Sequence, residues 1–259
     1  MKSIFALLAT SVCILVAAQN PIFFGQNRTF TVSPGNPVSG MAVWFSADCV
    51  TYSGGSCSSP SNGTSITTWD DRSGNANNLT SGTACPIATN VINGKPALGS
   101  VSSTLNCWYN LTSTIAAGST YSIFIVIERN SANGKYDYFT GDTNSFKYWS
   151  GNGTAGPMHG VDKACSAQQG TSTSTADSSW HQLNVVMDAS TLTFRKDRAS
   201  DGTGTHFTSS AVIKGIADGS CSSSERMDGY LAEAILYTTA LSGTDVTTNE
   251  TYLHNKYGL

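Results

Sequence analysis

The residues from Asp228 to the C-terminus, DGYLAEAILYTTALSGTDVTTNETYLHNKYGL, constrain the fold more than any other stretch of the chain. In Tyr230–Tyr237 the even-numbered residues share one face of a strand and the odd-numbered residues the other, and both faces are largely apolar. Ser242 then stands three residues before Asp245, a spacing typical of a helix N-terminal cap, and Gly258 suits a C-terminal cap. This pattern predicts a strand covered on both faces, followed by one short helix.

Four other stretches support the same interpretation. They are AVWFSAD (42–48), TTWDDRSGNANNLT (67–80), VINGKPAL (91–98) and SWHQLNVVMDAS (179–190). Together with the closing strand and helix, and in this order, they resemble the LamG-like, concanavalin A-like lectin and glucanase family. The resemblance extends over residues 41–259 and implies an all-β, concanavalin A-like jelly-roll β-sandwich with a short C-terminal helix. It implies no single activity, because one fold hosts many functions.

The N-terminus predicts export from the cell. Lys2 precedes an apolar run, Ile4–Val16, and small residues stand before Gln19, as in a secretory signal peptide. A membrane-spanning helix needs about 20 apolar residues, and this run is shorter, so we expect cleavage rather than membrane insertion. The expected organisation of this secreted, extracellular protein is a signal peptide (1–18), an N-terminal arm or leader strand (19–40) and one LamG-like jelly-roll domain (41–259).

The composition agrees with an exported all-β protein. It is rich in Ser, Thr, Asn and Gly, and only 12% of its residues are charged. The formal net charge is −3 and the basic residues are scattered along the chain, so we expect no nucleic-acid partner.

Six cysteines follow the expected signal peptide, and an even number in an exported chain predicts disulfide bonds rather than a metal site. Several pairings remain open. We favour bonds between sequence neighbours, because Cys49 and Cys57 bracket a turn-rich segment, TYSGGS. The predicted bonds are Cys49–Cys57, Cys85–Cys107 and Cys165–Cys221.

The motifs of the common catalytic centres are missing: the chain has no H-E-x-x-H, no G-x-S-x-G and no phosphate-binding glycine loop. A retaining glycosidase needs two carboxyl groups about 5–5.5 Å apart. Glutamates are scarce, so Glu233 with Asp228 or Asp142 is the pair that such an enzyme would use. We favour a structural role for Glu233, as an acceptor of buried hydrogen bonds, because the resembling family has a glutamate in its closing strand.

One enzyme family shares part of the pattern. WDDRSGNANNLT, INGKPA and HNKY resemble the YDQSGNGNHLT, LNGQKA and AKY segments of the arabinofuranosidase B catalytic domain. This resemblance implies a glycoside hydrolase as the alternative function. The stretch that would correspond to that family's nucleophilic glutamate, residues 136–151, contains no Glu.

A binding function requires only exposed aromatic rings and a few polar groups, because sugars pack their C–H faces on such rings. The candidates are the aromatic residues in polar surroundings: Trp108, Tyr136, Tyr138, Tyr148 and Trp149. We expect no cofactor; by analogy with related folds, Asp70 and Asp71 are the candidate ligands for a calcium ion.

The sequence therefore predicts a secreted carbohydrate-binding or adhesion protein whose partner is an extracellular glycan or glycoprotein. The alternative is a glycan-cleaving enzyme on the same fold, either a glycoside hydrolase or a polysaccharide lyase. The third option is a structural surface protein.

Overall fold

The computed structural model describes residues 35–100, 107–129, 136–141, 146–151, 156–163, 167–205, 211–217, 226–227 and 229–259. All of them belong to one compact unit, residues 33–259. The expected signal peptide (1–18) and the following residues to 34 lie outside the described part. No helix among the described residues is long and apolar enough to cross a membrane.

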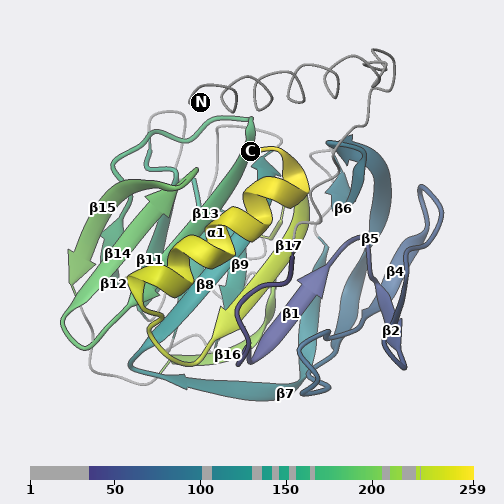
Figure 1. The fold of residues 1–259 in the computed structure, drawn as a ribbon, viewed down its shortest axis with the longest axis horizontal. Helices are drawn as coiled ribbons and strands as arrows, with labels where there is room; N and C mark the ends of the chain where they lie inside the picture. Colours follow the sequence, from purple (N-terminus) through teal and green to yellow (C-terminus); the bar gives the residue numbers. More distant parts are fainter. Residues whose placement is uncertain are drawn as a thin grey trace, which may run out of the picture. The chain divides into compact units, whose positions relative to one another are not determined.

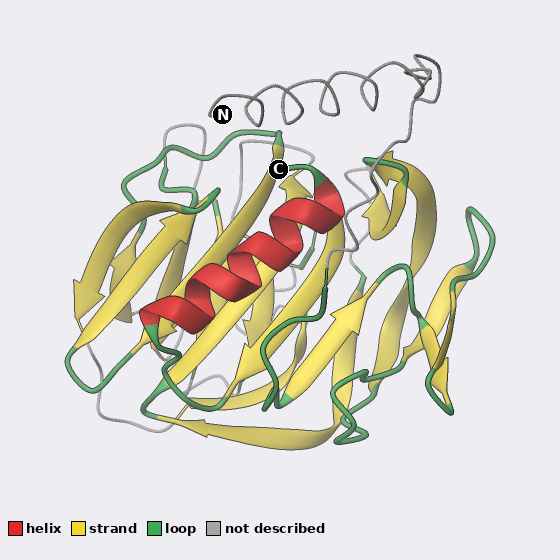
Figure 2. Ribbon diagram, in the orientation of Figure 1, coloured by secondary structure: helices red, strands yellow, loops and turns green. Residues whose placement is uncertain are grey.

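The described chain is all-β apart from one C-terminal helix, α1 (Gly243–Tyr257), so the predicted fold class is confirmed (Figures 1 and 2). Among the described residues, 15 strands form one continuous antiparallel sheet that curls into two facing layers. The helix-side layer consists, in spatial order, of β6 (Lys95–Ser100), β17 (Gly229–Tyr237), β8 (Tyr121–Arg129), β13 (Trp180–Met187), β14 (Thr191–Lys196) and β15 (Ala199–Thr205), with β1 (Val43–Ser46) paired to β17.

The far layer continues the same sheet. Its order is β12 (Ala167–Thr171), β11 (His159–Lys163), β10 (Lys147–Ser150), β9 (Tyr136–Thr140), β16 (Ala211–Ile216), β7 (Trp108–Gly118) and β5 (Leu79–Ile92), with β4 (Ser65–Trp69) paired to β5. A separate hairpin is formed by β2 (Thr51–Ser53) and β3 (Ser56–Ser58).

The two layers meet along both edges. At one edge β5 belongs to both, because its start pairs with β7 and its end with β6. At the other edge, just after β12, Thr173 donates its backbone N–H to the carbonyl oxygen of Asp201 in β15 at 2.7 Å. This approach requires glycine, because a Cβ on Gly170 would lie 2.7 Å from the Cα of Gly204. The sandwich is therefore nearly closed into a barrel.

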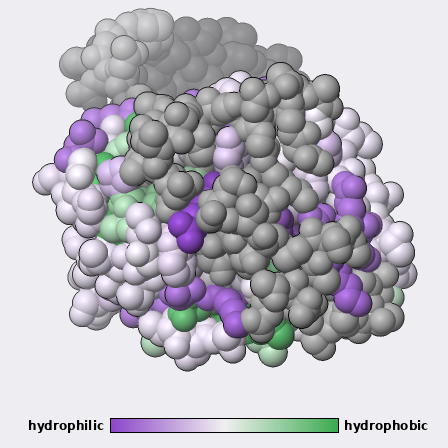
Figure 3. Space-filling view, turned by 180° about the vertical axis from the view of Figure 1, so that it is seen from behind, coloured by the Kyte–Doolittle hydropathy of each residue, from purple (hydrophilic) through white to green (hydrophobic). Residues whose placement is uncertain are grey.

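Two apolar clusters stabilise this arrangement. The larger fills the space between the layers and contains the fully buried Phe45, Ile125 and Phe194. The smaller lies between the helix-side layer and α1, and it contains Phe124 of β8 and Leu253 of the helix. Alternate residues of β8 thus enter different clusters, as expected for a strand buried on both faces. Figure 2 shows α1 lying across the strands of this layer, and the coloured surface in Figure 3 is mostly pale or hydrophilic.

The helix begins and ends at the predicted residues. Ser242 is its N-cap, and the Ser242 Oγ accepts a hydrogen bond from the backbone N–H of Asp245 at 3.2 Å. Gly258 is the C-cap, with a left-handed φ of 72°, and donates its N–H to the carbonyl oxygen of His254 at 2.7 Å. Glycine adopts this conformation without the steric cost that a Cβ would impose.

The predicted faces of the closing strand are wrong at its start. β17 is buried on both faces as predicted, but its pairing with β8 shifts between Leu231 and Glu233. Here Ala232 and Glu233 both lie on the α1 side, whereas Leu231 and Ala234 face the interior. A β-bulge adds one residue to one strand, so strict alternation fails and Glu233 is placed under the helix.

Two of the predicted disulfides lie within the described residues, and both are formed. Cys49 is bonded to Cys57 over a sequence separation of 8, and Cys85 to Cys107 over a separation of 22. The first bond closes the loop that contains the β2–β3 hairpin. The second joins β5 to the residue before β7. The predicted Cys165–Cys221 bond lies outside the described residues.

Candidate functional site

The tyrosines predicted to bind sugars are part of the interior. Tyr138 and Tyr148 are 2% and 0% exposed, and their ring centroids lie 6.5 Å apart within the larger apolar cluster. The pairing of β9 with β10 shifts, so that Tyr148 opposes Phe139 and Trp149 opposes Asp137. This bulge turns Tyr138 inward together with Phe139. The expectation that these two tyrosines are exposed is therefore wrong, because sequence alternation does not reveal a bulge.

The other aromatic candidates are enclosed or partly covered. Trp149 is fully buried. Tyr136 is also buried, with the guanidinium of Arg129 5.1 Å from its ring centroid. Trp108 is half-buried, and the guanidinium of Arg226 lies 5.2 Å from its ring centroid. Of the five predicted residues, only Trp108 therefore keeps part of its surface exposed.

Trp149 belongs to a buried charged cluster on the outer face of the far layer. It packs on Gly160 of β11, where a Cβ would lie 2.4 Å from the indole ring. Beside it, Nζ of Lys147 lies 3.2 Å from Oδ1 of Asp137, with both side chains at most 1% exposed, and Lys147 opposes Asp162 in register. A charge buried in the protein is costly without an oppositely charged partner, so this ion pair favours the observed pairing of β9 with β10.

Glu233, the first catalytic candidate, is a fully buried acceptor beneath α1. Five donors of the described chain bond to its carboxylate: Trp44 Nε1 (2.6 Å), Ser46 Oγ (3.2 Å), Tyr252 OH (2.7 Å), Lys256 Nζ (2.7 Å) and Tyr257 OH (2.6 Å). Glu233 thus joins the helix to β1 and β17, which is the structural role that the sequence favoured. Its proposed catalytic partners, Asp228 and Asp142, lie outside the described residues.

Asp71, one of the two calcium candidates, holds together the turn that follows β4. Its Oδ1 accepts the backbone N–H groups of Trp44 and Ser73, both at 2.9 Å, and its Oδ2 accepts that of Asn77 at 3.1 Å. Both oxygens are therefore engaged with the protein. The described residues contain no group of three or more His, Cys, Asp or Glu that could hold a metal ion.

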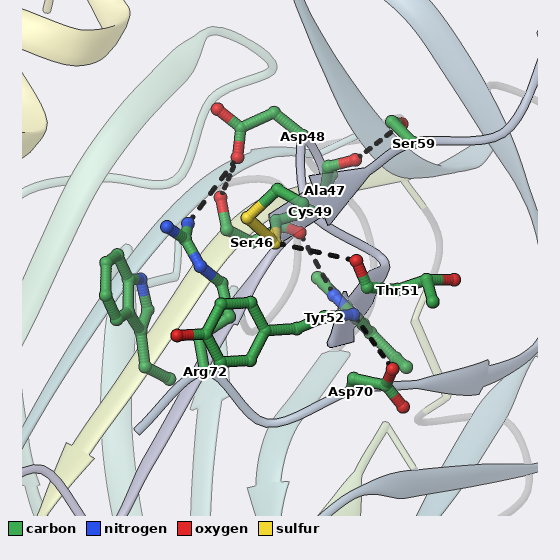
Figure 4. The surroundings of a disulfide bond; sticks show 12 residues. Ser46, Ala47, Asp48, Cys49, Thr51, Tyr52, Ser59, Asp70 and Arg72 are labelled. Carbon is green, nitrogen blue, oxygen red and sulfur yellow. Dashed lines mark hydrogen bonds and ion pairs between the residues drawn. A yellow bond between two sulfur atoms is a disulfide. The ribbon is translucent and has the colours of Figure 1, made fainter. Parts of the chain in front are cut away.

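A pocket of about 360 Å³ opens beside this turn. It is lined by Tyr52, Ser53, Gly54, Asp70, Asp71, Gly74, Ala76 and Asn78. Oδ2 of Asp70 accepts the backbone N–H of Tyr52 at 2.9 Å, a bond drawn in Figure 4. On the other side, Oδ1 of Asn78 accepts the N–H of Asp71 at 2.9 Å. Hydrogen bonds thus connect β2, the turn after β4 and the start of β5 around the pocket.

The Cys49–Cys57 disulfide holds the hairpin that carries Tyr52 (Figure 4). Tyr52 of β2 opposes Cys57 of β3, and the bond returns from Cys57 to the fully buried Cys49. The backbone N–H of Cys49 donates to the carbonyl oxygen of Ser46 at 2.9 Å, which anchors the hairpin to the end of β1. A side chain that is held in place before binding loses less conformational entropy when a ligand arrives.

Charged residues connect this region to the buried Glu233. The guanidinium of Arg72 lies 3.8 Å from the Trp44 ring centroid and 3.8 Å from Oδ1 of Asp48. Nζ of Lys256, which also bonds to Glu233, lies 3.1 Å from the same Asp48 oxygen. Burial alone raises the pKa of Asp48, but Lys256 and a hydroxyl donor outweigh burial and lower the pKa overall. Asp48 therefore remains ionised at the edge of this network.

The pocket combines groups suited to a neutral polar ligand. The half-exposed Tyr52 offers an aromatic ring, and Asp70 offers a carboxylate whose Oδ1 accepts no hydrogen bond from the described chain. The described lining contains two carboxylates and no Lys, Arg or His, so an anionic ligand would be repelled. An aromatic surface with a few converging polar groups is typical of small-ligand sites.

The sequence prediction did not include Tyr52. Its signal was its place in TYSGGS, the segment bracketed by the first two cysteines after the expected signal peptide. A tyrosine in a short loop closed by a disulfide is held at the surface, where it cannot join the core.

Several solved structures share the fold. Domain 4 of AbnA, a GH43 extracellular arabinanase from Geobacillus stearothermophilus solved with arabinotriose, matches with a TM-score of 0.53 and 14% identity, over 74% of this chain and 100% of that one. An arabinofuranosidase complexed with arabinofuranosyl-alpha-1,2-xylobiose has a TM-score of 0.56 and 16% identity, over 86% and 61% of the two chains. A GH54 α-L-arabinofuranosidase soaked with a cyclic sulfate inhibitor has a TM-score of 0.54 and 16% identity, over 76% and 52%.

At these identities the matches establish the fold, a β-sandwich, and no activity. The chain spans 61% and 52% of the lengths of the two arabinofuranosidases. No family model and no curated protein matches the sequence.

Proposed function

We propose that this protein is an extracellular glycan-binding module whose ligand occupies the pocket of Tyr52, Asp70 and Asn78. One observation carries the proposal: the half-exposed Tyr52, on a hairpin fixed by a disulfide, lines the same pocket as Asp70, whose Oδ1 accepts no hydrogen bond from the described chain. A sugar ring would place a C–H face against Tyr52 and donate a hydroxyl hydrogen bond to Oδ1 of Asp70.

The ligands in the structures of similar fold support this class of partner. Domain 4 of AbnA was solved with arabinotriose and the arabinofuranosidase with arabinofuranosyl-alpha-1,2-xylobiose. Both are neutral oligosaccharides, which agrees with a pocket whose described lining has two carboxylates and no basic side chain. We therefore propose a neutral extracellular glycan, alone or on a glycoprotein, as the partner.

The same proposal includes the location and the domain organisation. The two disulfides are typical of proteins exported to an oxidising compartment, and AbnA, whose domain 4 is similar in fold, is an extracellular arabinanase. We infer a signal peptide over residues 1–18, an arm over 19–40 and a LamG-like, concanavalin A-like lectin domain over 41–259. The motifs near residues 42–48 and 179–190 support the assignment to LamG-like domains.

Binding without cleavage is the activity that this site supports best. A glycosidase needs two available carboxyl groups, one on each side of the scissile bond. Both oxygens of Asp71 are engaged in the turn, which leaves Asp70 as the one available carboxylate among the described residues that line the pocket. Glu233 is enclosed by its five donors and is not exposed.

A glycan array tests the proposal when it is combined with a reducing-sugar release assay on the mature chain, residues 19–259. We expect binding to neutral oligosaccharides, weaker binding in Tyr52→Ala and Asp70→Ala, and no sugar release. Thr248→Ala, on the exposed side of α1, is the matched control. Addition of EDTA should leave binding unchanged, because the described residues contain no group of three or more His, Cys, Asp or Glu that could hold a metal ion.

An array without any bound glycan, or wild-type binding by Tyr52→Ala, would contradict the proposal. Robust sugar release by the wild-type chain would favour the glycoside hydrolase alternative instead.

A further inference from the structure

The helix does not cover the whole outer face of the helix-side layer. In β8 every second residue points to this outer face, namely Phe124, Val126 and Glu128. Phe124 and Val126 are fully buried in the cluster beneath α1. Glu128 is half-exposed, so the cover ends between Val126 and Glu128.

At this uncovered end, three side chains form a row across neighbouring strands. Trp180 of β13 and Tyr230 of β17 oppose Glu128 from its two sides. Residues directly opposite each other on adjacent strands share a face and are in contact range. The two rings lie nearly parallel above β8, with centroids 5.9 Å apart and planes 15° apart, and all three residues are half-exposed. The row is thus an accessible aromatic surface with a carboxylate at its centre.

The strand beyond Tyr230 places a glycine opposite its ring. Gly99 of β6 opposes Tyr230 and has no side chain to cover its ring. A larger residue does not fit there, because a Cβ on Gly99 would lie 1.9 Å from the carbonyl oxygen of Gly229. The packing of the backbone therefore excludes a side chain at position 99, and Tyr230 stays half-exposed.

We propose that Trp180, Glu128 and Tyr230 form a second glycan-contact site, distinct from the Tyr52 pocket. The inference rests on the proposed glycan-binding function and adds a second contact surface to it. The apolar edges and outward faces of the two rings accept sugar C–H groups. Glu128 accepts hydrogen bonds from the hydroxyl groups of the same ligand.

The geometry disfavours the two other kinds of occupant. An apolar protein surface would bury the carboxylate of Glu128 without a donor, at a cost in free energy. A cage for an ammonium group needs ring faces directed at the cation, whereas these rings face each other at 5.9 Å. Partial burial raises the pKa of Glu128, which shows that its carboxylate is incompletely solvated. Hydroxyl groups of a ligand would donate hydrogen bonds that stabilise the charged form.

Titration calorimetry with four neutral trisaccharides, arabinotriose, xylotriose, cellotriose and mannotriose, tests the second site. The proteins to compare are the wild type, Tyr52→Ala, Trp180→Ala, Glu128→Gln and the combination of Tyr52→Ala with Trp180→Ala, with Thr248→Ala as the control. We expect each single substitution to weaken binding of at least one trisaccharide about fivefold or more. Tyr52→Ala should keep residual binding that disappears in the double variant.

Each outcome decides a separate point. Binding lost in Tyr52→Ala but unchanged in both Trp180→Ala and Glu128→Gln would overturn the second site and leave the first intact. No binding of any trisaccharide by the wild type would overturn both. If the melting temperature of Trp180→Ala is well below that of the wild type, the affinity of Glu128→Gln tests the second site instead. A Gln at this half-exposed position keeps the size of the side chain and removes only its charge.

Discussion

Two acidic residues, Glu233 and Asp70, differ in the number of hydrogen-bond donors around them. This difference distinguishes a carboxylate that stabilises the fold from one that can bind a ligand. Glu233 lies under α1 with no exposed surface and five donors around it. Asp70 lines the pocket and accepts one backbone N–H from Tyr52, and its other oxygen accepts no hydrogen bond from the described residues. A carboxylate whose acceptor positions are all filled fixes the fold, whereas one with an unused oxygen can receive a ligand.

The largest expected effect is on the buried side of this comparison. Glu233→Gln removes one of the two carboxylates that face the buried ammonium group of Lys256 and leaves only Asp48, at 3.1 Å, so it should lower the free energy of unfolding by about 3–4 kcal/mol, the lower part of the range for a broken buried pair. That exceeds the ~1–3 kcal/mol expected for a lost hydrogen-bond acceptor alone. Urea unfolding at pH 7 measures the change.

The combination of Glu233→Gln with Lys256→Met is the control, because it removes both charges and should recover part of the loss. A free energy of unfolding equal to that of the wild type in Glu233→Gln would show that the buried pair does not stabilise the fold.

A second prediction contrasts two aromatic residues. Trp149→Ala removes a fully buried indole and should cost about 3–5 kcal/mol of stability. Tyr52→Ala acts at a half-exposed hairpin and should change stability by less than about 1 kcal/mol. Thermal and urea unfolding of both variants check this difference. If Trp149→Ala had the melting temperature of the wild type, Trp149 would not be a buried core residue and would again be a candidate for sugar binding.

The third prediction separates the two disulfides. Replacing Cys85 and Cys107 by Ser should cost about 3.5 kcal/mol, and replacing Cys49 and Cys57 about 2.5 kcal/mol, because the longer loop constrains the unfolded chain more. Only the second pair of substitutions should also weaken glycan binding, since it releases the hairpin of Tyr52. Equal losses of binding in both variants would indicate a general effect on folding.

The sequence predicted the elements well and the directions of side chains less well. The closing strand, the helix with Ser242 and Gly258 at its ends, and both described disulfides follow from local patterns of apolar spacing, capping and cysteine position. The β-bulges at Glu233 and Tyr138 do not, because a bulge depends on pairing with a strand that is distant in sequence.

The site was harder to predict for a related reason. Polar neighbours in the sequence suggested that Trp149 is exposed, but Gly160 of the next strand receives its ring. Tyr52 becomes a candidate only when the turn at Asp70 is folded against its hairpin. Both facts depend on contacts between separate segments, which a single sequence does not display.

The smallest expected effect concerns His181, whose two carboxylate partners are more exposed than Glu233 but are both engaged in hydrogen bonds. Its Nδ1 lies 2.7 Å from Oδ2 of Asp197 and its Nε2 2.8 Å from Oδ1 of Asp177. Burial alone lowers the pKa of His181, but these two bonds outweigh burial and raise the pKa overall. The folded protein therefore holds this proton more tightly than the unfolded chain, whose histidine pKa is about 6.5.

The stabilisation by His181 should be complete below pH ~6.5 and should be lost as the pH rises through the folded pKa. Asp177 and Asp197 are 45% and 37% exposed, so we expect the contribution to stay below about 1 kcal/mol. The difference in melting temperature between the wild type and His181→Gln should narrow from pH 6 to pH 9. A constant difference over this range would show that protonation of His181 does not matter to stability.

Glycan binding at the Tyr52 pocket is tested most directly by the dissociation constant of Tyr52→Ala for the oligosaccharide with the strongest array signal. Calorimetry should find this variant about 5- to 150-fold weaker than the wild type, equivalent to ~1–3 kcal/mol, with an almost unchanged melting temperature. Tyr52→Phe, which keeps the ring, should lose much less. Wild-type affinity in a normally folded Tyr52→Ala protein would contradict the proposed site.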